Sequence, residues 1–476
     1  MKMSSAERAQ MMLHAPVSRI IPKLAIPTII SMLMTSIYNM ADTYFVSQIS
    51  TSASGAVGVV FSVMGIIQAI AFTIGMGSGA SVSQALGAGK QDEAQTLCNV
   101  GFFTAMMTGV VILILGNVFI DPIVGFLGAT ETIAPHAKAY ASYIFYAAPF
   151  VMNNHLRFQG LATYGMVGIT TGGILNMFLD PIFIFEPGHM LFGFLTLPFG
   201  FGLGTAGAAI ATAISQATSF FILLLQCNLR RDTISIHPRH FRPTKKMYWK
   251  ILYVGFPSLG RQGIASVANI LLNNTVKACV TLALQDPAIS AISIVSRFVM
   301  FINSSVIGFG QGFQPVCGFN YGAGQYSRVR KAFWFSVKVT TVILLVLGLI
   351  AFVFAQPIVT AFRAEDAEVI RIGTLALRMH LLTIPLWGFI VMGNMFTQSI
   401  GYGGRATLLS ASRQGIFLIP ALLTLPRVLP LAEANVPFAI AAAQPVADAL
   451  SLVMAIFIVM SILRQFRQMP DKALEK

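Results

Sequence analysis

Residues 94–120 read AQTLCNVGFFTAMMTGVVILILGNVFI, and this stretch contains no charged side chain. An apolar run of about 20 residues is long enough to cross the hydrocarbon core of a bilayer as a helix. Because exposed backbone polar groups find no partner in lipid, such a run is predicted to be helical. Eleven further runs are long and mostly apolar, at residues 24–46, 56–84, 137–160, 166–186, 204–228, 251–280, 288–318, 332–356, 370–398, 406–428 and 437–463. The sequence therefore predicts an all-α polytopic membrane protein with twelve transmembrane helices.

The composition of the chain excludes the soluble classes. Of its 476 residues, 55% are hydrophobic and only 10% are charged, whereas soluble chains carry about 25% charged residues. The four cysteines lie far apart, so no metal-binding or redox spacing is present. The formal charge of +14 does not indicate nucleic-acid binding, because the basic residues lie between apolar runs. No nucleophile–base, metal or ATPase signature is present, so we expect a transporter driven by an ion gradient and not an enzyme.

Lysine and arginine are concentrated in alternate loops. If both termini are cytoplasmic, most of the 31 basic residues fall in cytoplasmic segments, and residues 229–250 form the most basic of these. Cytoplasmic loops carry an excess of Lys and Arg, and this bias sets the orientation of the helices. We therefore expect a multi-pass protein with both termini in the cytoplasm.

The chain contains an internal repeat. Pro27 matches Pro257 at an offset of 230 residues, and the run 87–89 (GAG) matches 322–324 at an offset of 235. Each half has six predicted helices, an even number, so the two halves enter the membrane in the same direction. Parallel repeats of this kind are typical of secondary transporters. The predicted parts are an N-terminal lobe at residues 1–228, a basic cytoplasmic linker at 229–250 and a C-terminal lobe at 251–476, with a central cleft between the lobes.

Three carboxylates fall inside the apolar runs, namely Asp42, Asp180 and Asp448. A carboxylate at bilayer depth costs at least about 2.5–3.5 kcal/mol, so it is functional by default. Burial favours the protonated form, which allows such a group to load and unload a proton. Asn39 lies three residues before Asp42 and Asn176 lies four residues before Asp180, so each pair shares a helical face. A position at the membrane interface is the alternative for both acids.

Comparison of the two halves of the repeat predicts that the coupling ion binds in the N-terminal half. At the repeat offsets, Leu272 stands opposite Asp42 and Ile419 stands opposite Asp180. The second half therefore keeps the fold signals and lacks both acids. Asp448 could either pair with an arginine in a structural role or take part in function, and the sequence does not decide between the two.

Arg261 and Arg297 also lie inside C-terminal runs. Long basic side chains near a helix end can extend to the interface, which is the alternative for these two residues. If they face the substrate cleft instead, the C-terminal lobe is electropositive. We therefore treat Arg261, Arg297 and Asp448 as candidates for contact with substrate.

Four motifs together resemble the multidrug and toxic compound extrusion (MATE) family, and within it the prokaryotic DinF-type branch with its MepA-like exporters. They are NMFLDPIFIF at 176–185, GAAIATAIS at 207–215, GFGQGFQP at 308–315 and NYGAG at 320–324. The resemblance implies a V-shaped pair of six-helix lobes and antiport of organic compounds against H⁺ or Na⁺. It also implies a prokaryotic inner membrane location, a monomer surrounded by lipid, small organic substrates and no cofactor beyond the coupling ion.

The resemblance further implies a coupling site in the N-terminal lobe. Asp42 and Asp180 match the paired carboxylates of the family, and Asn176 and Thr212 match its supporting polar positions. Two further residues look like contributors from the fourth helix: Tyr140 and Asn154, with Asn153 as the competitor of Asn154. The glutamate of helix 7 and the aspartate of helix 10 that other branches carry are absent here.

These observations favour an H⁺-coupled exporter of amphiphilic compounds that works by alternating access. Asp42, Asp180, Asn176 and Thr212 all offer oxygen ligands, so the same site could hold Na⁺. Two alternatives therefore stay open. One is a Na⁺-coupled exporter of a specific metabolite, either anionic or not. The other is a lipid-linked sugar flippase of the same superfamily.

Overall fold

The computed structural model describes residues 5–127, 131–147, 154–191, 194–229, 233–362, 366–428 and 436–473. Within these ranges the chain is helical except for one short hairpin, in which β1 (Met190–Leu191) pairs antiparallel with β2 (Leu195–Thr196). Ten of the described helices are long and apolar enough to cross a membrane. The prediction of an all-α polytopic membrane protein is therefore confirmed.

The chain forms two compact units. Unit 1 contains Met1–Ala9 and Ile26–Gly255, and unit 2 contains Gln10–Ala25 and Phe256–Lys476. The boundaries between the units fall inside three helices, α1 (Ser5–His14), α2 (Val17–Ser47) and α10 (Lys245–Cys279). The sequence placed the end of the N-terminal lobe at residue 228 and the start of the C-terminal lobe at residue 251, which differ from these unit boundaries. The division into lobes stays a prediction.

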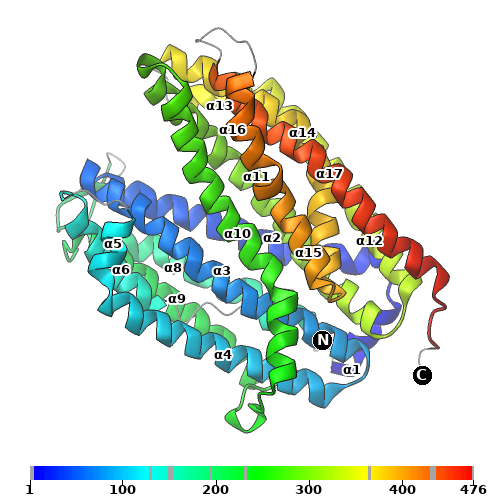
Figure 1. Ribbon diagram of the computed structural model, residues 1–476. Helices are drawn as coiled ribbons and strands as arrows, with labels where there is room; N and C mark the ends of the chain where they lie inside the picture. The colour runs from blue at the N-terminus through cyan, green and yellow to red at the C-terminus, as the bar shows by residue number, and fades with distance from the viewer. Residues whose placement is uncertain are drawn as a thin grey trace. The chain divides into compact units, whose positions relative to one another are not determined.

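Unit 1 is built around α8 (Ala162–Ile184) and α9 (Gly204–Leu229), which pack against each other (Figure 1). A second packed pair is α3 (Thr51–Gly87) with α4 (Gln91–Val118), and α6 (Ala134–Ala147) packs against both α3 and α9. Unit 1 also contains the first part of α1, most of α2 and the first part of α10. Its other described helices are short, namely α5 (Ile120–Phe126), α7 (Asn154–Phe158) and a 3₁₀ turn, η2 (Pro238–His240).

Unit 2 is organised around α14 (Ala367–Ser399), which packs against α11 (Leu282–Gly322), α12 (Tyr326–Val353) and α17 (Val436–Gln468) (Figure 1). The short α13 (Ala355–Phe362) packs beside α14. Between α15 (Gly403–Ala411) and α16 (Leu418–Val428) the chain makes a π turn, η3 (Ser412–Ile416). Such π turns occur frequently at functional sites, because they change the direction of side chains within a helix.

The helices follow the predicted runs with two differences. The run 137–160 is represented by α6 and α7, and residues 148–153 lie outside the described part of the chain. The run 406–428 is divided by the π turn. The 35-residue helix α10 has the length of a span, but Arg261 and Lys277 lower the hydropathy of its apolar stretch, and it is not among the ten.

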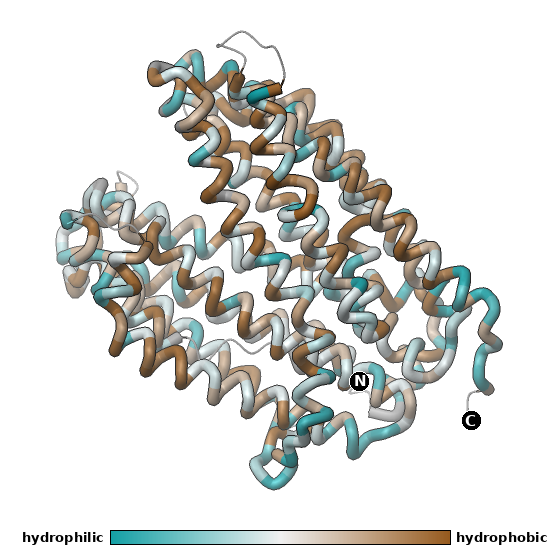
Figure 2. Tube along the Cα trace, in the orientation of Figure 1, coloured by the Kyte–Doolittle hydropathy of each residue, from teal (hydrophilic) through white to brown (hydrophobic). Residues whose placement is uncertain are grey.

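Hydropathy along the chain agrees with a membrane location. Figure 2 shows hydrophobic residues along most of the helices, with hydrophilic residues gathered at the C-terminal end of α17 and in the segment between α9 and α10. Many large apolar side chains are exposed, such as Phe178, Phe457 and Val118. A soluble monomer rarely exposes apolar patches on this scale, whereas lipid accommodates them.

Within unit 1, α3 and the first part of α10 approach closely at two glycines. A Cβ placed on Gly77 would collide with the carbonyl oxygen of Ile251, and a Cβ on Gly255 would collide with the carbonyl oxygen of Thr73. Small residues at helix crossings allow the backbones to come into contact, which is a common source of helix association in membranes. These glycines therefore determine how closely the two helices pack.

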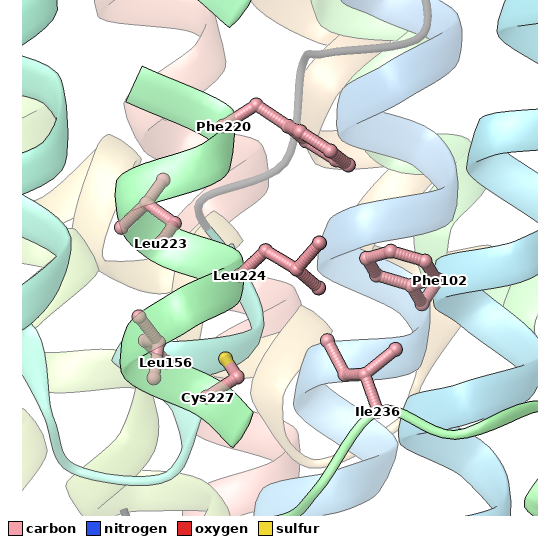
Figure 3. Close-up of a pocket in the computed structure, with 7 residues that line it drawn as sticks. All are labelled: Phe102, Leu156, Phe220, Leu223, Leu224, Cys227 and Ile236. Carbon is pink, nitrogen blue, oxygen red and sulfur yellow. The ribbon is translucent and has the colours of Figure 1, made fainter. Parts of the chain in front are cut away.

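A small cavity in unit 1 lies between α9, α4 and the segment that follows α9. Phe220 and Leu224 of α9 point toward Phe102 of α4, with Ile236 beside them (Figure 3). The cavity measures about 10 Å³. Because its walls are apolar and its volume is that of about one water probe, it is a packing gap and not a binding site.

Candidate functional site

Asp42 lies on α2 and is only 6% exposed. Tyr140, which is fully buried on α6, donates a hydrogen bond from its hydroxyl to Asp42 Oδ2 at 2.7 Å. A hydrogen bond to a carboxylate stabilises the ionised form. The other oxygen, Asp42 Oδ1, is buried and has no hydrogen-bond partner among the described residues. The carboxylate is therefore held from one side only.

Asp180 lies on α8 and is fully buried. Asn176 is one helical turn earlier, and its Nδ2 donates to Asp180 Oδ1 at 3.0 Å and to the Thr212 hydroxyl of α9 at 3.3 Å. The spacing of four residues puts Asn176 and Asp180 on one face of α8, as predicted. Pro181 follows directly within the helix and removes one backbone donor from the ladder.

Three oxygens in this cluster lack a partner in the described structure: Asp42 Oδ1, Asp180 Oδ2 and Asn176 Oδ1. The Asp42 and Asp180 carboxyls are also close enough for their charges to interact. A buried acceptor without a donor is costly, and two neighbouring carboxylates in an apolar setting cannot easily both stay ionised. The arrangement is therefore short of positive charge, and a proton or a small cation would complete it.

We call the group of Asp42, Tyr140, Asn176, Asp180 and Thr212 the N-cluster. No set of three or more His, Cys, Asp or Glu side chains in the described ranges could hold a metal ion. A cation in the N-cluster would instead be held by carboxylate, amide and hydroxyl oxygens. These are hard ligands of the kind that suit hydrophilic cations and not transition metals.

Two residues proposed from the sequence are not placed in the N-cluster by the structure. Asn39 is half-buried, and its side chain makes no hydrogen bond within the described residues. The side chain of Asn154 lies outside the described part of the chain, as does the whole of its competitor Asn153. Their expected roles stay predictions.

Two further polar residues near the N-cluster were not found by sequence reasoning. Tyr38 lies one turn before Asp42 on α2, close enough for the two side chains to interact electrostatically. Ser215 lies three residues after Thr212 on α9, and its hydroxyl is buried with no partner in the described structure. In both cases the helical spacing from a predicted site residue was the available signal.

Asp448 has quite different surroundings in unit 2. Its Oδ1 accepts hydrogen bonds from Arg413 Nε at 2.7 Å and Gln444 Nε2 at 3.0 Å. Its Oδ2 accepts from Trp387 Nε1 at 2.8 Å and the Thr383 hydroxyl at 3.1 Å. Both oxygens are therefore satisfied, and the charge is paired with an arginine. Asp448 therefore has no unpartnered oxygen among the described residues, whereas the two acids of the N-cluster each have one.

The sequence left the partner of Asp448 open, and the structure identifies it as Arg413. The guanidinium of Arg413 also lies over the Trp387 ring, 3.8 Å from the centroid. Among the other residues proposed to contact substrate, Arg297 lines a cavity within unit 2. Arg261 instead donates a hydrogen bond of 3.4 Å to the Asn394 side chain.

Comparison with known proteins shows the family to which this chain belongs. The MatE family model matches residues 27–182 and 264–423, which is more than half of the chain. The multidrug export protein MepA of Staphylococcus saprophyticus is 24% identical over 404 residues, covering 84% of this chain and 85% of its own. MepA of Staphylococcus aureus strain MSSA476 is 26% identical over 418 residues, covering 86% and 87%.

A solved structure described as the outward-facing conformation of a multidrug resistance MATE family transporter of the MOP superfamily is also similar. It superposes with a TM-score of 0.85 at 25% identity, covering 95% of this chain and 98% of that one. MATE proteins are transporters, so the expectation that this protein is not an enzyme is confirmed. The chain belongs to the MATE family of multi-pass membrane transporters.

Proposed function

We propose that this protein exports amphiphilic organic compounds from the cytoplasm in exchange for H⁺, with both termini on the cytoplasmic side. The relatives named multidrug export proteins match most of the chain and support the substrate class. The basic segment between α9 and α10 and the basic C-terminal end of α17 support the orientation.

The observation that carries the coupling mechanism is the set of unpartnered oxygens in the N-cluster. Protonation of Asp42 or Asp180 converts an acceptor without a partner into a donor and removes a buried negative charge. A ligand shifts a conformational equilibrium only when it binds the two states with different affinity. Protons taken up from outside would favour the conformation that releases substrate, and proton loss to the cytoplasm would restore the form that binds it.

Sodium is the alternative coupling ion, because the same oxygens could ligate it. The N-cluster holds two carboxylates and no basic side chain, so H⁺ and Na⁺ would neutralise the same charge. The two ions should therefore compete. We infer that H⁺ is the principal coupling ion, because both carboxylates lie in an apolar setting that favours the protonated form.

Transport into proteoliposomes separates these ions. With fluorescent amphiphilic compounds of both charges, an imposed ΔpH should drive transport in sodium-free buffer, and Na⁺ on the protonating side should slow it. Asp42→Asn and Asp180→Asn should abolish the response to ΔpH. Asp92→Asn, at the exposed start of α4, is the matched control and should transport normally. Transport that requires Na⁺ and ignores ΔpH would overturn the proton assignment, and normal coupling in both site variants would overturn the N-cluster itself.

A further inference from the structure

Unit 2 contains a cavity of about 360 Å³ that the coupling mechanism does not use. Its walls come from α10, α11, α14, the π turn η3, α16 and α17. Small-molecule sites commonly measure about 300–1,000 Å³ and are mostly apolar with a few polar groups. This cavity fits that description, since aliphatic residues form most of its wall. Its polar lining residues include Arg297, Asn303, His380, Arg413 and Gln444, and no acidic side chain is found among the described residues that line it.

Arg297 is the first charged group of this cavity. It lies well inside the long helix α11, and its side chain is exposed. It makes no ion pair or hydrogen bond with the described residues. A charged side chain within a membrane-spanning helix is expensive, and such residues usually face a bundle interior or a water-filled cavity that serves as a substrate path. Arg297 is therefore positioned to bind a ligand and not to balance an acid of the protein.

Arg413 is the second charged group, and the fold holds it in a defined direction. It belongs to the π turn, its Nε is bound to Asp448 at 2.7 Å, and its plane lies over Trp387. Its two terminal nitrogens donate no hydrogen bond to the described residues. A guanidinium fixed in this way presents its remaining donors in a planar arrangement that matches the geometry of a carboxylate or sulfonate.

The same geometry disfavours a cation in the cavity. The neighbouring acid, Asp448, is fully buried, and four donors already occupy its two oxygens. An organic cation would therefore meet two guanidinium groups with no free carboxylate. An anion would meet one arginine without a counter-ion and one whose terminal donors are unused.

We propose that the unit 2 cavity binds amphipathic organic anions, with the carboxylate or sulfonate against Arg297 and Arg413 and the apolar body along the aliphatic wall. This assignment rests on the proposed export function and names a substrate class for it. The anionic group supplies the acceptors that the two guanidinium groups lack. The apolar body gains free energy by leaving water for walls built by residues such as Leu418 and Val299.

Binding can be measured apart from transport. We would titrate the full-length protein in phosphatidylcholine nanodiscs by isothermal calorimetry, with empty nanodiscs as the reference. The probes are naphthalene-2-sulfonate and its cationic counterpart trimethyl(2-naphthyl)ammonium, which share the same ring. The sulfonate should bind at least about tenfold more tightly, as expected for one charge-assisted hydrogen bond.

Arg297→Gln should weaken sulfonate binding by about tenfold or more, and Arg297→Lys should retain most of it. Arg427→Gln is the matched control, because Arg427 is exposed on α16, donates a hydrogen bond to the Leu423 carbonyl and does not line the cavity. Equal binding of the two probes, or equal sulfonate affinity in the Arg297→Gln and Arg427→Gln variants, would overturn the proposal.

The outcome is independent of the coupling ion. Sulfonate binding that depends on Arg297 supports the anion site even if ΔpH drives no transport, in which case only the proposed coupling fails. Conversely, ΔpH-driven transport of the cationic probe with no bound sulfonate would support the coupling and refute the anion site.

Discussion

Replacing Arg413 by methionine should destabilise unit 2 strongly, because it would leave a charge buried without its counter-ion. Asp448 is 0% exposed and Arg413 is 14% exposed, and the two are joined by a 2.7 Å hydrogen bond. Methionine has nearly the length of the arginine stem, so the packing against Trp387 is largely kept. The change therefore removes the charge and its hydrogen bond more than the contact surface.

The magnitude follows from what remains around Asp448. Removing one partner of a buried ion pair typically costs about 3–5 kcal/mol. Three donors stay in place, from Thr383, Trp387 and Gln444, so we expect a loss near the lower end, about 3 kcal/mol. Adding Asp448→Asn to Arg413→Met removes the uncompensated charge while keeping an acceptor for Trp387. The double variant should therefore recover most of the lost stability.

The free energy of unfolding in mixed detergent micelles measures this effect. Arg371→Met is the control, because the Arg371–Glu368 pair has a similar 2.8 Å separation but side chains that are 39% and 44% exposed. An exposed pair is worth about 0–1 kcal/mol. If Arg413→Met costs no more than Arg371→Met, or if the double variant is less stable than the single one, the stabilising role of the buried Arg413–Asp448 pair is refuted.

Two further predictions concern unit 1. Gly77→Ala should lower the free energy of unfolding by about 1–3 kcal/mol, because its Cβ would collide with the Ile251 backbone. Gly58→Ala is the control in the same helix, since its Cβ meets nothing within 4 Å, and it should be neutral or slightly stabilising. Equal stability of the two variants would contradict the close approach of the helices. Tyr140→Phe removes a hydrogen bond worth about 1.5–3 kcal/mol to the charged form of Asp42, so protonation becomes easier and the pH of half-maximal ΔpH-driven transport should rise by about one unit or more. An unchanged pH profile would show that the Tyr140–Asp42 bond does not affect coupling.

Local patterns in the sequence were enough to predict the membrane helices and the Asn176–Asp180 pair of the N-cluster. Apolar length alone indicates spans, since a bilayer has one thickness and lipid offers no hydrogen bonds. The Asn176–Asp180 bond also follows from sequence, because residues four apart on a helix are neighbours. Thr212 and Tyr140 were predicted through family resemblance, and both make hydrogen bonds in the N-cluster.

The long-range partners were decided only by tertiary structure. Tyr140 reaches Asp42 across 98 residues of sequence, and Arg413 reaches Asp448 across 35. Helical periodicity says which side chains share a face, but it does not say which face of another helix packs opposite. The π turn adds a change of direction at Arg413 that no 3.6-residue pattern predicts. Whether a buried acid is paired with an arginine, as Asp448 is, or keeps an unpartnered oxygen, as Asp42 does, therefore depends on packing that the sequence alone does not reveal.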